Sequence, residues 1–239
     1  MEIDSYSYNH FLTNIDKEIK YPKYTSFGII PFFVIDNEPY FILIQRKETI
    51  SFVLFVKNKY EKLRLNPEEE IKKMTFEEKK YLLEMMKWHE NKNIPSDLYS
   101  NLIKYKDYLL NSINDTHGQL EWFFPKGRKN NSKESCYLTA IREFYEETTF
   151  SKCIKEIFIY KPIHCYKYGS DKKKYNYIFY PALIDHTKLP FGLYNNRIIS
   201  VSSNEVSHIG IFTKEELKKK IDNVIPNLYE KIKKELYIN

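Results

Sequence analysis

The sequence has few of the features that mark secreted, zinc-binding or membrane-spanning proteins. Cysteine occurs three times, at Cys136, Cys153 and Cys165, and no two of these residues form a CxxC pair. This usage predicts a reducing compartment, with neither a disulfide framework nor a zinc site. No apolar run approaches the roughly 18 residues needed to span a bilayer. Residues 1–8 also lack the basic and apolar regions of a signal peptide. We therefore expect a soluble, intracellular protein.

The charge of the chain is biased toward the positive sign. The formal net charge is +6 over 239 residues, which favours a polyanionic partner such as RNA or a polyphosphate. Much of the excess comes from lysines near the C-terminus: Lys214, Lys218, Lys219, Lys220, Lys231, Lys233 and Lys234. Their helical spacing is typical of a solvated face rather than of a binding stripe. The length fits one domain of ordinary size, or one domain with an inserted module.

Strand-like segments flank a long interruption. Residues 25–35 and 40–45 are two apolar runs around the turn residues Asp36-Asn37-Glu38-Pro39, which predicts a β-hairpin. Because both runs are almost continuously apolar, we expect a sheet that is covered on both faces. Further strands are predicted at residues 120–124, 154–160, 163–168, 175–184 and 208–212, with a helix broken near Pro226 at residues 214–236.

The interruption, from about Glu48 to Asp115, has the composition of a helical module. It contains no glycine, and charged residues alternate with large apolar ones. Thr75 followed by two glutamates predicts a helix from residue 75 to about 91, and Pro95-Ser96-Asp97 predicts another. The expected apolar stripes are Tyr81, Leu82, Met85, Met86 and Trp88 in the first helix, and Leu98, Leu102, Tyr105 and Leu109 in the second.

A third predicted helix, from about Ser132 to Thr149, carries the acidic residues of interest. At 100° per residue, its apolar side chains fill an arc of roughly 160°. That arc consists of Ala140, Phe144, Tyr137, Ile141, Tyr145 and Leu138. Glu143, Glu146 and Glu147 fall together on another arc, with Arg142 beside them. Because clustered carboxylates repel one another, the pattern indicates a site for a hard divalent cation such as Mg²⁺ or Mn²⁺.

The alternative is that residues 142–147 form a solvated charged face, which is common for isolated motifs of this kind. The surroundings favour the metal site. A predicted strand, a Pro125-Lys126-Gly127 turn and the acidic helix follow one another directly. A metal in such a place neutralises phosphate charge and lowers the pKa of a bound water, as hydrolysis of a diphosphate requires.

The same segment resembles the Nudix box, usually written GX5EX7REUXEEXGU, where U is a bulky aliphatic residue. Gly127, Glu134 and the run Arg142-Glu143-Phe144-Tyr145-Glu146-Glu147 match it, up to Phe150. Two departures stand out. One additional residue separates Gly127 from Glu134, and Thr149 replaces the second glycine. Residues 131–134 fit a capping arrangement, so Glu134 has the alternative role of fixing the helix start. A β-branched residue is poor at positive φ, so we expect the helix to end differently here.

The resemblance implies an α/β fold, the Nudix α/β/α sandwich with a mixed sheet, formed by residues 1–47 and 116–239. Residues 48–115 would be an all-helical insertion. It also implies that Glu143 and Glu147 are metal ligands, joined by the Gly127 carbonyl. Glu146 would be a further ligand or the residue that activates water, and Arg142 would orient the carboxylates by ion pairing. The implied cofactor is Mg²⁺ or Mn²⁺.

Other segments resemble the mRNA-decapping enzymes of large cytoplasmic DNA viruses. They are residues 25–30, 42–47, 51–55 and 122–127, together with the helical insertion. This resemblance implies hydrolysis of the 5′ cap of mRNA to 7-methylguanosine diphosphate and 5′-monophosphate RNA, in the host cytoplasm or after packaging in the virion. Some members of this group also act on diphosphoinositol polyphosphates. Hydrolysis of another nucleoside diphosphate derivative stays open, and so does a non-catalytic Nudix-fold module that binds RNA.

Residues outside the box complete the predicted site. By resemblance, Phe52 and Tyr177 are candidates for stacking on the methylated base, with Lys126 as a further substrate-binding residue. The alternative for both rings is a place in the core, because 16% of the residues are aromatic. Glu205 stands where relatives carry a general base, against the alternative of a plain surface acid. His164 and His208 are interpreted as structural.

Overall fold

A computed structural model describes residues 21–87, 94–115, 118–150, 152–169 and 171–237. The chain divides into two compact units, each considered separately below. The sheet unit comprises the described residues of Met1–Gln45, Trp122–Gly169 and Lys173–Asn239. The helical unit comprises those of Arg46–Glu121 and Ser170–Lys172.

The sheet unit begins with the predicted hairpin. Strands β1 (Thr25–Ile35) and β2 (Glu38–Arg46) are antiparallel, and Ile35 pairs with Glu38 across a two-residue turn. The turn residues Asp36 and Asn37 have φ of 51° and 64°. Positive φ at both positions is the type I′ geometry that matches the twist of paired strands, and Asn and Asp tolerate it better than most residues.

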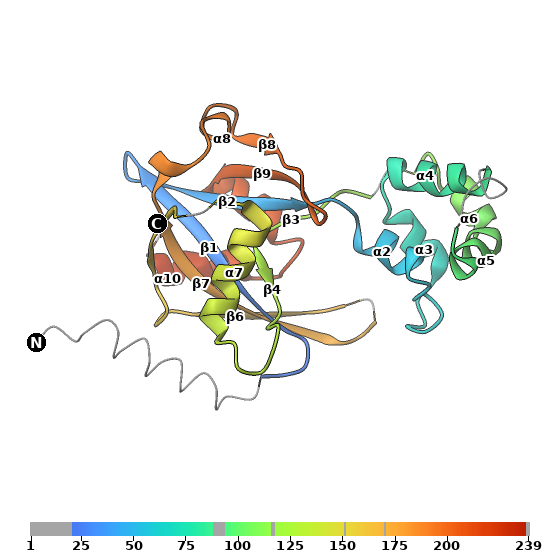
Figure 1. Ribbon diagram of the computed structural model, residues 1–239, viewed down its shortest axis with the longest axis horizontal. Coiled ribbons are helices and arrows are strands. Elements are labelled where there is room, and N and C mark those ends of the chain that lie inside the picture. Colours follow the sequence, from blue (N-terminus) through green and yellow to red (C-terminus); the bar gives the residue numbers. More distant parts are fainter. Residues whose placement is uncertain (1–20, 88–93, 116–117, 151, 170, 238–239) are drawn as a thin grey trace, which may run out of the picture. The chain divides into compact units, whose positions relative to one another are not determined.

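The described strands form one nine-stranded mixed sheet in the order β5-β7-β1-β2-β9-β8 (Figure 1). The remaining strands pair at its margins: β3 with β2, β4 with β1 and β6 with β7. β1 and β7 are parallel, whereas β1 is antiparallel to β2 and β4, and β7 to β5 and β6. The bounds are β3 Trp122–Phe123, β4 Lys126–Gly127, β5 Ile154–Ile157, β6 Ile163–Tyr168, β7 Lys174–Ile184, β8 Ile198–Ser200 and β9 Val206–Thr213. This mixed sheet confirms the predicted α/β class.

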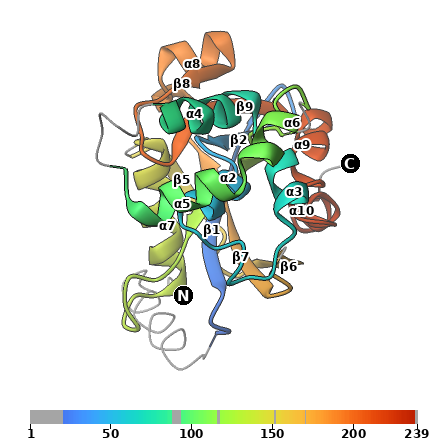
Figure 2. The same cartoon turned by 90° about the vertical axis from the view of Figure 1, so that its right-hand side faces the viewer.

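Helices cover both faces of the sheet. Helix α7 (Cys136–Thr148) packs on β1, β4 and β7, whereas α9 (Lys214–Ile221) contacts β3 and β9, and α10 (Leu228–Leu236) contacts β6. Figures 1 and 2 show α7 on one side of the strands with α9 and α10 on the other. The layers are therefore α/β/α, and the predicted break between the two C-terminal helices is confirmed.

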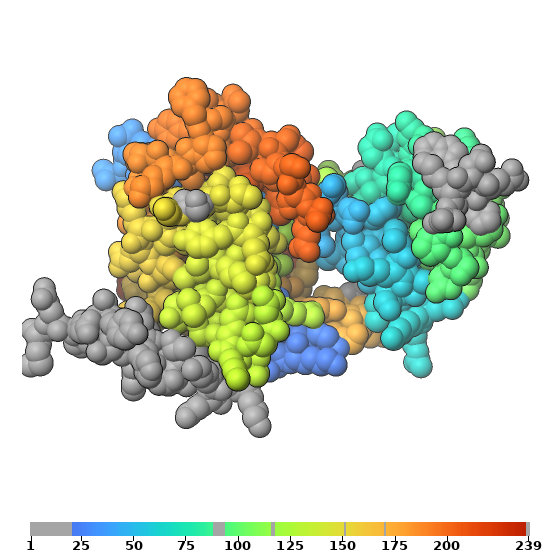
Figure 3. All heavy atoms as spheres, viewed as in Figure 1, coloured from blue at the N-terminus to red at the C-terminus, as the bar shows by residue number. Residues whose placement is uncertain are grey.

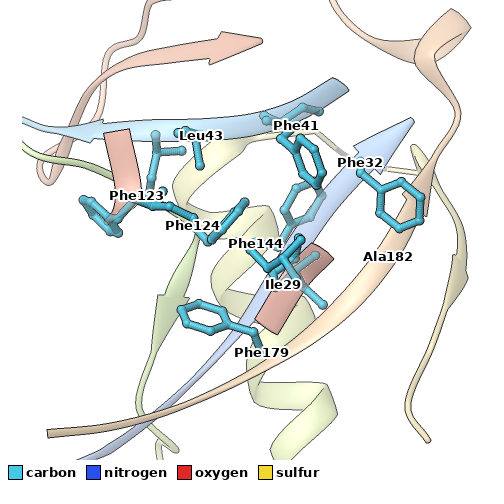
Figure 4. Close-up of a cluster of buried hydrophobic side chains, with 14 of the residues drawn as sticks. Ile29, Phe32, Phe41, Leu43, Phe123, Phe124, Phe144, Phe179 and Ala182 are labelled. Atoms are coloured by element: carbon cyan, nitrogen blue, oxygen red, sulfur yellow. The ribbon is translucent and has the colours of Figure 1, made fainter. Parts of the chain in front are cut away.

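The core explains why the strands read as continuous apolar runs. Seven consecutive residues of β1, from Phe27 to Phe33, are buried, because side chains on both faces meet a covering layer. Figure 4 shows Phe144 of α7 among side chains of β1, β2 and β7, such as Ile29, Phe41 and Phe179. The acidic helix is thus anchored to the sheet through its apolar face.

In the sheet unit, three short helices or strands were not predicted from the sequence. They are α8 (Phe191–Asn196), β8 and β4, the last of which occupies the place of the expected Pro-Lys-Gly turn. Elements of six residues or fewer carry too few positions for a hydrophobic period to emerge. A single 3₁₀ turn, η2 (His186–Lys188), lies before α8. The predicted strand at residues 154–160 ends at Ile157.

The described residues of the helical unit contain α2 (Ile50–Val56), α3 (Pro67–Lys72), α4 (Phe76–Lys87), α5 (Ser96–Lys104) and α6 (Lys106–Asn111). The predicted start of α4 is confirmed, since Thr75 Oγ1 accepts from the Glu78 amide and the Glu78 carboxylate accepts from the Thr75 amide. Residues 88–91 of the expected helix, including Trp88, lie outside the described residues. The second predicted helix is broken in two at Tyr105, although its whole expected stripe is buried.

The state of the cysteines and the character of the helices can be compared with what the composition predicted. Cys136, Cys153 and Cys165 are free, buried thiols. Within the described residues, no helix combines the length and the apolar character that crossing a membrane requires.

Candidate active site

Helix α7 starts later than predicted. Its N-cap is Ser135, whose side chain accepts from the Leu138 amide, so the first helical residue is Cys136 rather than Ser132. Asn131 Oδ1 instead accepts from the amides of Lys133 and Glu134, which closes a turn ahead of the helix. The expected apolar arc is correct for Ala140 and Phe144, which are fully buried, but Leu138 is 45% exposed.

Gly127 and Glu143 meet where β4 passes α7. A Cβ atom built on Gly127 would overlap the carboxylate of Glu143. Any residue other than glycine at this position would therefore displace that carboxylate. The Glu143 side chain is only 15% exposed, and its burial raises the pKa of the carboxyl. The charges of Glu146 and Glu205 raise it further, whereas Arg142 opposes the shift.

Glu147 is the most deeply buried acid of the site. Its residue is 9% exposed, and Oε2 accepts a 2.8 Å hydrogen bond from the backbone amide of Lys126. Burial raises the pKa of Glu147 to about 8, and the charges of Glu143 and Glu205 raise it as well. The Lys126 ammonium and its backbone N–H act in the opposite direction. A buried carboxylate with like charges beside it favours binding of a proton or a metal cation.

Arg142 ties the polar side of α7 together. Its Nε donates to Glu134 Oε1 at 2.8 Å, and its Nη1 donates to Glu143 Oε1 at 2.7 Å and Glu146 Oε2 at 2.9 Å. Its Nη2 donates to the carbonyl of Arg128. These bonds join three carboxylates to the loop that precedes the helix.

Glu134 lies before the helix rather than in its first turn. One oxygen accepts from the Asn130 amide at 2.7 Å, and both oxygens accept from Arg142. The Arg142 guanidinium holds the pKa of this carboxyl below its usual range. The longer loop is therefore closed by Glu134, which links the loop to Arg142.

The three predicted acids occupy different environments instead of one shared cluster. Glu143 and Glu147 point toward β4, whereas the Glu146 side chain is 57% exposed and is paired with Arg142. Within the described residues, no group of three or more His, Cys, Asp or Glu side chains is gathered in a way that would hold a metal ion. Glu143, Glu147 and the Gly127 segment nevertheless fit such an ion, since they bring hard oxygen donors and buried negative charge to one place.

The structure brings Glu205 to this site from the loop between β8 and β9. Its backbone amide donates to Ser203 Oγ, and its side chain is exposed. Its charge acts on both Glu143 and Glu147, although more than fifty positions separate them in the chain. Figure 3 shows this orange segment beside the yellow-green surface of α7.

The predicted substrate-binding rings are both buried. Tyr177 is 7% exposed, and the Lys126 ammonium lies 5.5 Å from its ring centre and 4.5 Å from that of Phe123. Phe52 is 6% exposed within the apolar cluster of the helical unit, where its ring is 6.2 Å from that of Tyr81. Both rings are therefore packed as core side chains, which was the alternative to a role in base stacking.

The helix end corrects one expectation. Thr149 is the C-cap of α7 and adopts the left-handed conformation, with φ 61° and ψ 8°. The prediction that a β-branched residue would force a different ending is wrong. Its amide donates to the Tyr145 carbonyl, and its hydroxyl donates to the Thr148 carbonyl. The hydrogen bonds hold threonine in a conformation that glycine adopts more easily.

Two features of the site were not predicted. The backbone N–H of Lys126 holds Glu147, and the carbonyl of Arg128 holds Arg142. Every residue has these main-chain groups, so the residue types at positions 126 and 128 do not reveal that they make these bonds. Only the position of both residues next to Gly127 could have pointed to them. The histidines interpreted as structural lie elsewhere: His164 is exposed on β6, and His208 Nδ1 lies 3.1 Å from Ser207 Oγ.

Comparisons with known proteins add to this geometry. No protein-family model matches the chain. The chain is 29% identical over 133 residues to a putative mRNA-decapping protein of Acanthamoeba polyphaga mimivirus. The match covers 55% of the chain and 33% of that relative, so the chain spans about a third of the relative's length. This similarity confirms the resemblance to viral decapping proteins.

A solved structure of a C. elegans Ap4A hydrolase binary complex is similar to the chain at a TM-score of 0.45 and 13% identity. The similarity covers 89% of this chain and 97% of the hydrolase chain.

Proposed function

We propose that this chain is a metal-dependent hydrolase of diphosphate linkages of the Nudix type, and that its main substrate is the 5′ cap of mRNA. One observation carries the proposal. Glu147 is buried and bonded to the amide of Lys126, beside Glu143, which rests against Gly127. The charge of Glu205 acts on both acids. A structural helix gains nothing from holding buried acids together, whereas a metal site requires it.

In this proposal, Glu143, Glu147 and the Gly127 carbonyl would hold Mg²⁺ or Mn²⁺, and Glu146 would be an additional ligand or the residue that activates water. The bound ion supplies neutralisation of phosphate charge and a more acidic water. Arg142 fixes the Glu143 and Glu146 carboxylates through its ion pairs. The exposed carboxylate of Glu205 accepts the proton of the attacking water, and the Lys126 ammonium attracts a substrate phosphate.

Cap hydrolysis is favoured over other diphosphates by the similarity to a putative mRNA-decapping protein. Tyr177 stays our candidate for the methylated base, but its ring is buried, and the Lys126 ammonium near it would have to move aside before a base could stack there. Phe52 would have to leave the core of the helical unit to serve in the same way. We also propose that the reaction takes place in the cytoplasm of an infected host cell, which the similarity to a viral protein supports.

The test is hydrolysis of cap-labelled RNA with Mg²⁺ or Mn²⁺, run beside free cap dinucleotide and a diphosphoinositol polyphosphate. We expect release of labelled 7-methylguanosine diphosphate, and fastest turnover on capped RNA. Faster turnover of the inositol compound would mean that it, and not the cap, is the main substrate, and the assigned reaction type would stand. Binding of RNA without any labelled product would overturn the hydrolase and favour a binding module.

A further inference from the structure

We propose that a second site in the sheet unit binds the single-stranded RNA chain that follows the cap. This tyrosine site consists of Tyr24 and Tyr175 with the cationic side chains of Lys23, Arg128 and Lys173. The inference rests on the proposed function, since it assigns a place to the RNA part of the substrate. It concerns residues that the resemblance to other enzymes leaves without a role.

The unusual feature is the number of cations around one ring. The Lys23 and Lys173 ammonium groups lie 5.7 and 5.4 Å from the centre of the Tyr24 ring, and the Arg128 guanidinium lies 5.7 Å from it. The ring of Tyr175 lies 5.5 Å from that of Tyr24, tilted by 44°. Three cationic side chains gathered at one ring attract a polyanion.

Strand register places the site on one face of the sheet. Gly28 of β1 pairs with both Lys126 of β4 and Phe179 of β7. Side chains alternate along a strand, so even-numbered positions of β1 and β4 share a face with odd-numbered positions of β7. Tyr24, Arg128 and Tyr175 therefore lie on the same face as Lys126 and Tyr177. The cation over the Tyr177 ring agrees with this assignment.

The tyrosine site is joined to the carboxylates through a short segment. The Lys126 amide holds Glu147, and the Arg128 carbonyl accepts from Arg142, so both ends of residues 126–128 are bonded to α7. Tyr24 lies four residues along β1 from Gly28, or roughly 13 Å. Because a Cβ on Gly127 would point at Glu143, the neighbouring side chains Lys126 and Arg128 lie on the other face of β4. An RNA whose 5′ diphosphate is at the carboxylates would therefore have to pass the end of β4 to reach Tyr24.

The combination of rings and cations favours single-stranded RNA over other polyanions. Bases stack on tyrosine faces while phosphates pair with lysine and arginine, and this pairing is tolerant of sequence. An inositol polyphosphate would use the cations alone, since it has no flat face to stack. Loss of the rings therefore separates these ligands, whereas loss of the cations weakens both.

The test is binding of a fluorescent, uncapped oligouridylate, measured by anisotropy in EDTA so that no hydrolysis occurs. We expect the double variant Tyr24→Ala, Tyr175→Ala to raise Kd at least ~5-fold. Tyr24→Phe keeps the ring and should bind like wild type. Tyr237→Ala is the control, because Tyr237 also lies near a lysine, Lys161, but is more exposed than the half-buried Tyr24 and Tyr175.

Salt dependence gives a readout that does not depend on the alanine variants folding. In a complex with single-stranded RNA, each phosphate paired with a cationic side chain adds ~0.7 to the slope of log K against log salt. We therefore expect Arg128→Gln and Lys173→Gln each to lower the slope by this amount. Unchanged slopes, or an unchanged Kd in the folded double tyrosine variant, would overturn the inference, as would equal weakening by Tyr237→Ala.

Hydrolysis assays keep this inference distinct from the proposed function. In the double tyrosine variant, we expect the rate on capped RNA relative to cap dinucleotide to fall at least ~5-fold below the wild-type ratio. An unchanged ratio in an active enzyme would overturn the tyrosine site and keep the hydrolase. Weakened RNA binding in a protein that hydrolyses neither substrate would keep the tyrosine site and overturn the hydrolase.

Discussion

Glu147 is the carboxylate of the site that is most nearly cut off from water. Replacing it by glutamine keeps its shape and its bond from the Lys126 amide, and removes the negative charge that would hold the metal. Residues that merely support metal ligands contribute ~10–100-fold to activity, so we expect Glu147→Gln to lower kcat at least ~100-fold. The measurement is release of labelled product from capped RNA at saturating Mn²⁺.

Glu156→Gln is the matched control for that substitution, because Glu156 is an exposed acid on β5. It should retain wild-type turnover. Full activity of Glu147→Gln would contradict the assignment of this residue as a metal ligand. It would favour the alternative that residues 142–147 form a solvated charged face.

Thr149 stores conformational strain at the end of α7. Its φ of 61° costs a β-branched residue roughly 1–2 kcal/mol, whereas the same conformation costs glycine little. Glycine loses part of the gain through the greater entropy of the unfolded chain. We therefore expect Thr149→Gly to raise the free energy of unfolding by up to about 1 kcal/mol, or roughly 2–4 °C in Tm. Thermal melting followed by circular dichroism measures the change.

Thr149→Ala separates strain from side-chain loss, since alanine lacks the hydroxyl but keeps Cβ at positive φ. It should give no stabilisation. If alanine and glycine raised Tm equally, relief of backbone strain would not be the cause.

At the scale of secondary-structure elements, the contact of β4 with α7 depends on one glycine. A methyl group on Gly127 would overlap the Glu143 carboxylate, so Gly127→Ala should move that carboxylate away from the site. Because misplacement of a catalytic group by about 1 Å costs ~100-fold, we expect a loss of activity of that order. Gly192→Ala is the control, since its Cβ would meet Ile199 only at 3.7 Å. Turnover of both variants on capped RNA makes the comparison, and similar losses would contradict the local explanation.

Elements with a strong local signal were predicted well from sequence. The hairpin of β1 and β2, the cap at Thr75 and the break between α9 and α10 each follow from a few neighbouring residues. The start of α7 was misjudged because Ser132 and Ser135 both suit an N-cap. Only the turn closed by Asn131 selects between them.

Placement of the site could be predicted only in part. The period of the helix brings Glu143 and Glu147 to one side, but the wheel treats Glu146 as equivalent, although it lies in solvent beside Arg142. The difference arises from β4, which covers part of the helix and supplies a main-chain donor. The charge of Glu205 reaches the same acids only through the order of strands in the sheet, which no local pattern encodes.

For the molecule as a whole, the two units have separate apolar clusters, so we expect two unfolding transitions rather than one. A ligand that binds only the folded sheet unit stabilises that unit alone, by about 2.7 kcal/mol at one hundred times its Kd. Saturating Mn²⁺ should therefore raise one transition and leave the other in place. Differential scanning calorimetry in EDTA and in Mn²⁺ resolves the two.

The glutamine variant sharpens this expectation, because the same negative charge that binds the metal destabilises the metal-free fold. Burial raises the pKa of Glu147 from 4.5 to about 8, so between these pH values folding without metal must take up a proton and is less favourable. A neutral glutamine avoids this cost, so Glu147→Gln should melt at or above the temperature of the wild type in EDTA. It should also lose most of the Mn²⁺-dependent shift, while Glu156→Gln keeps it. A Glu147→Gln protein that melts lower in EDTA and retains the full shift would show that the buried carboxylate is structural. The metal would then have to bind elsewhere in the chain.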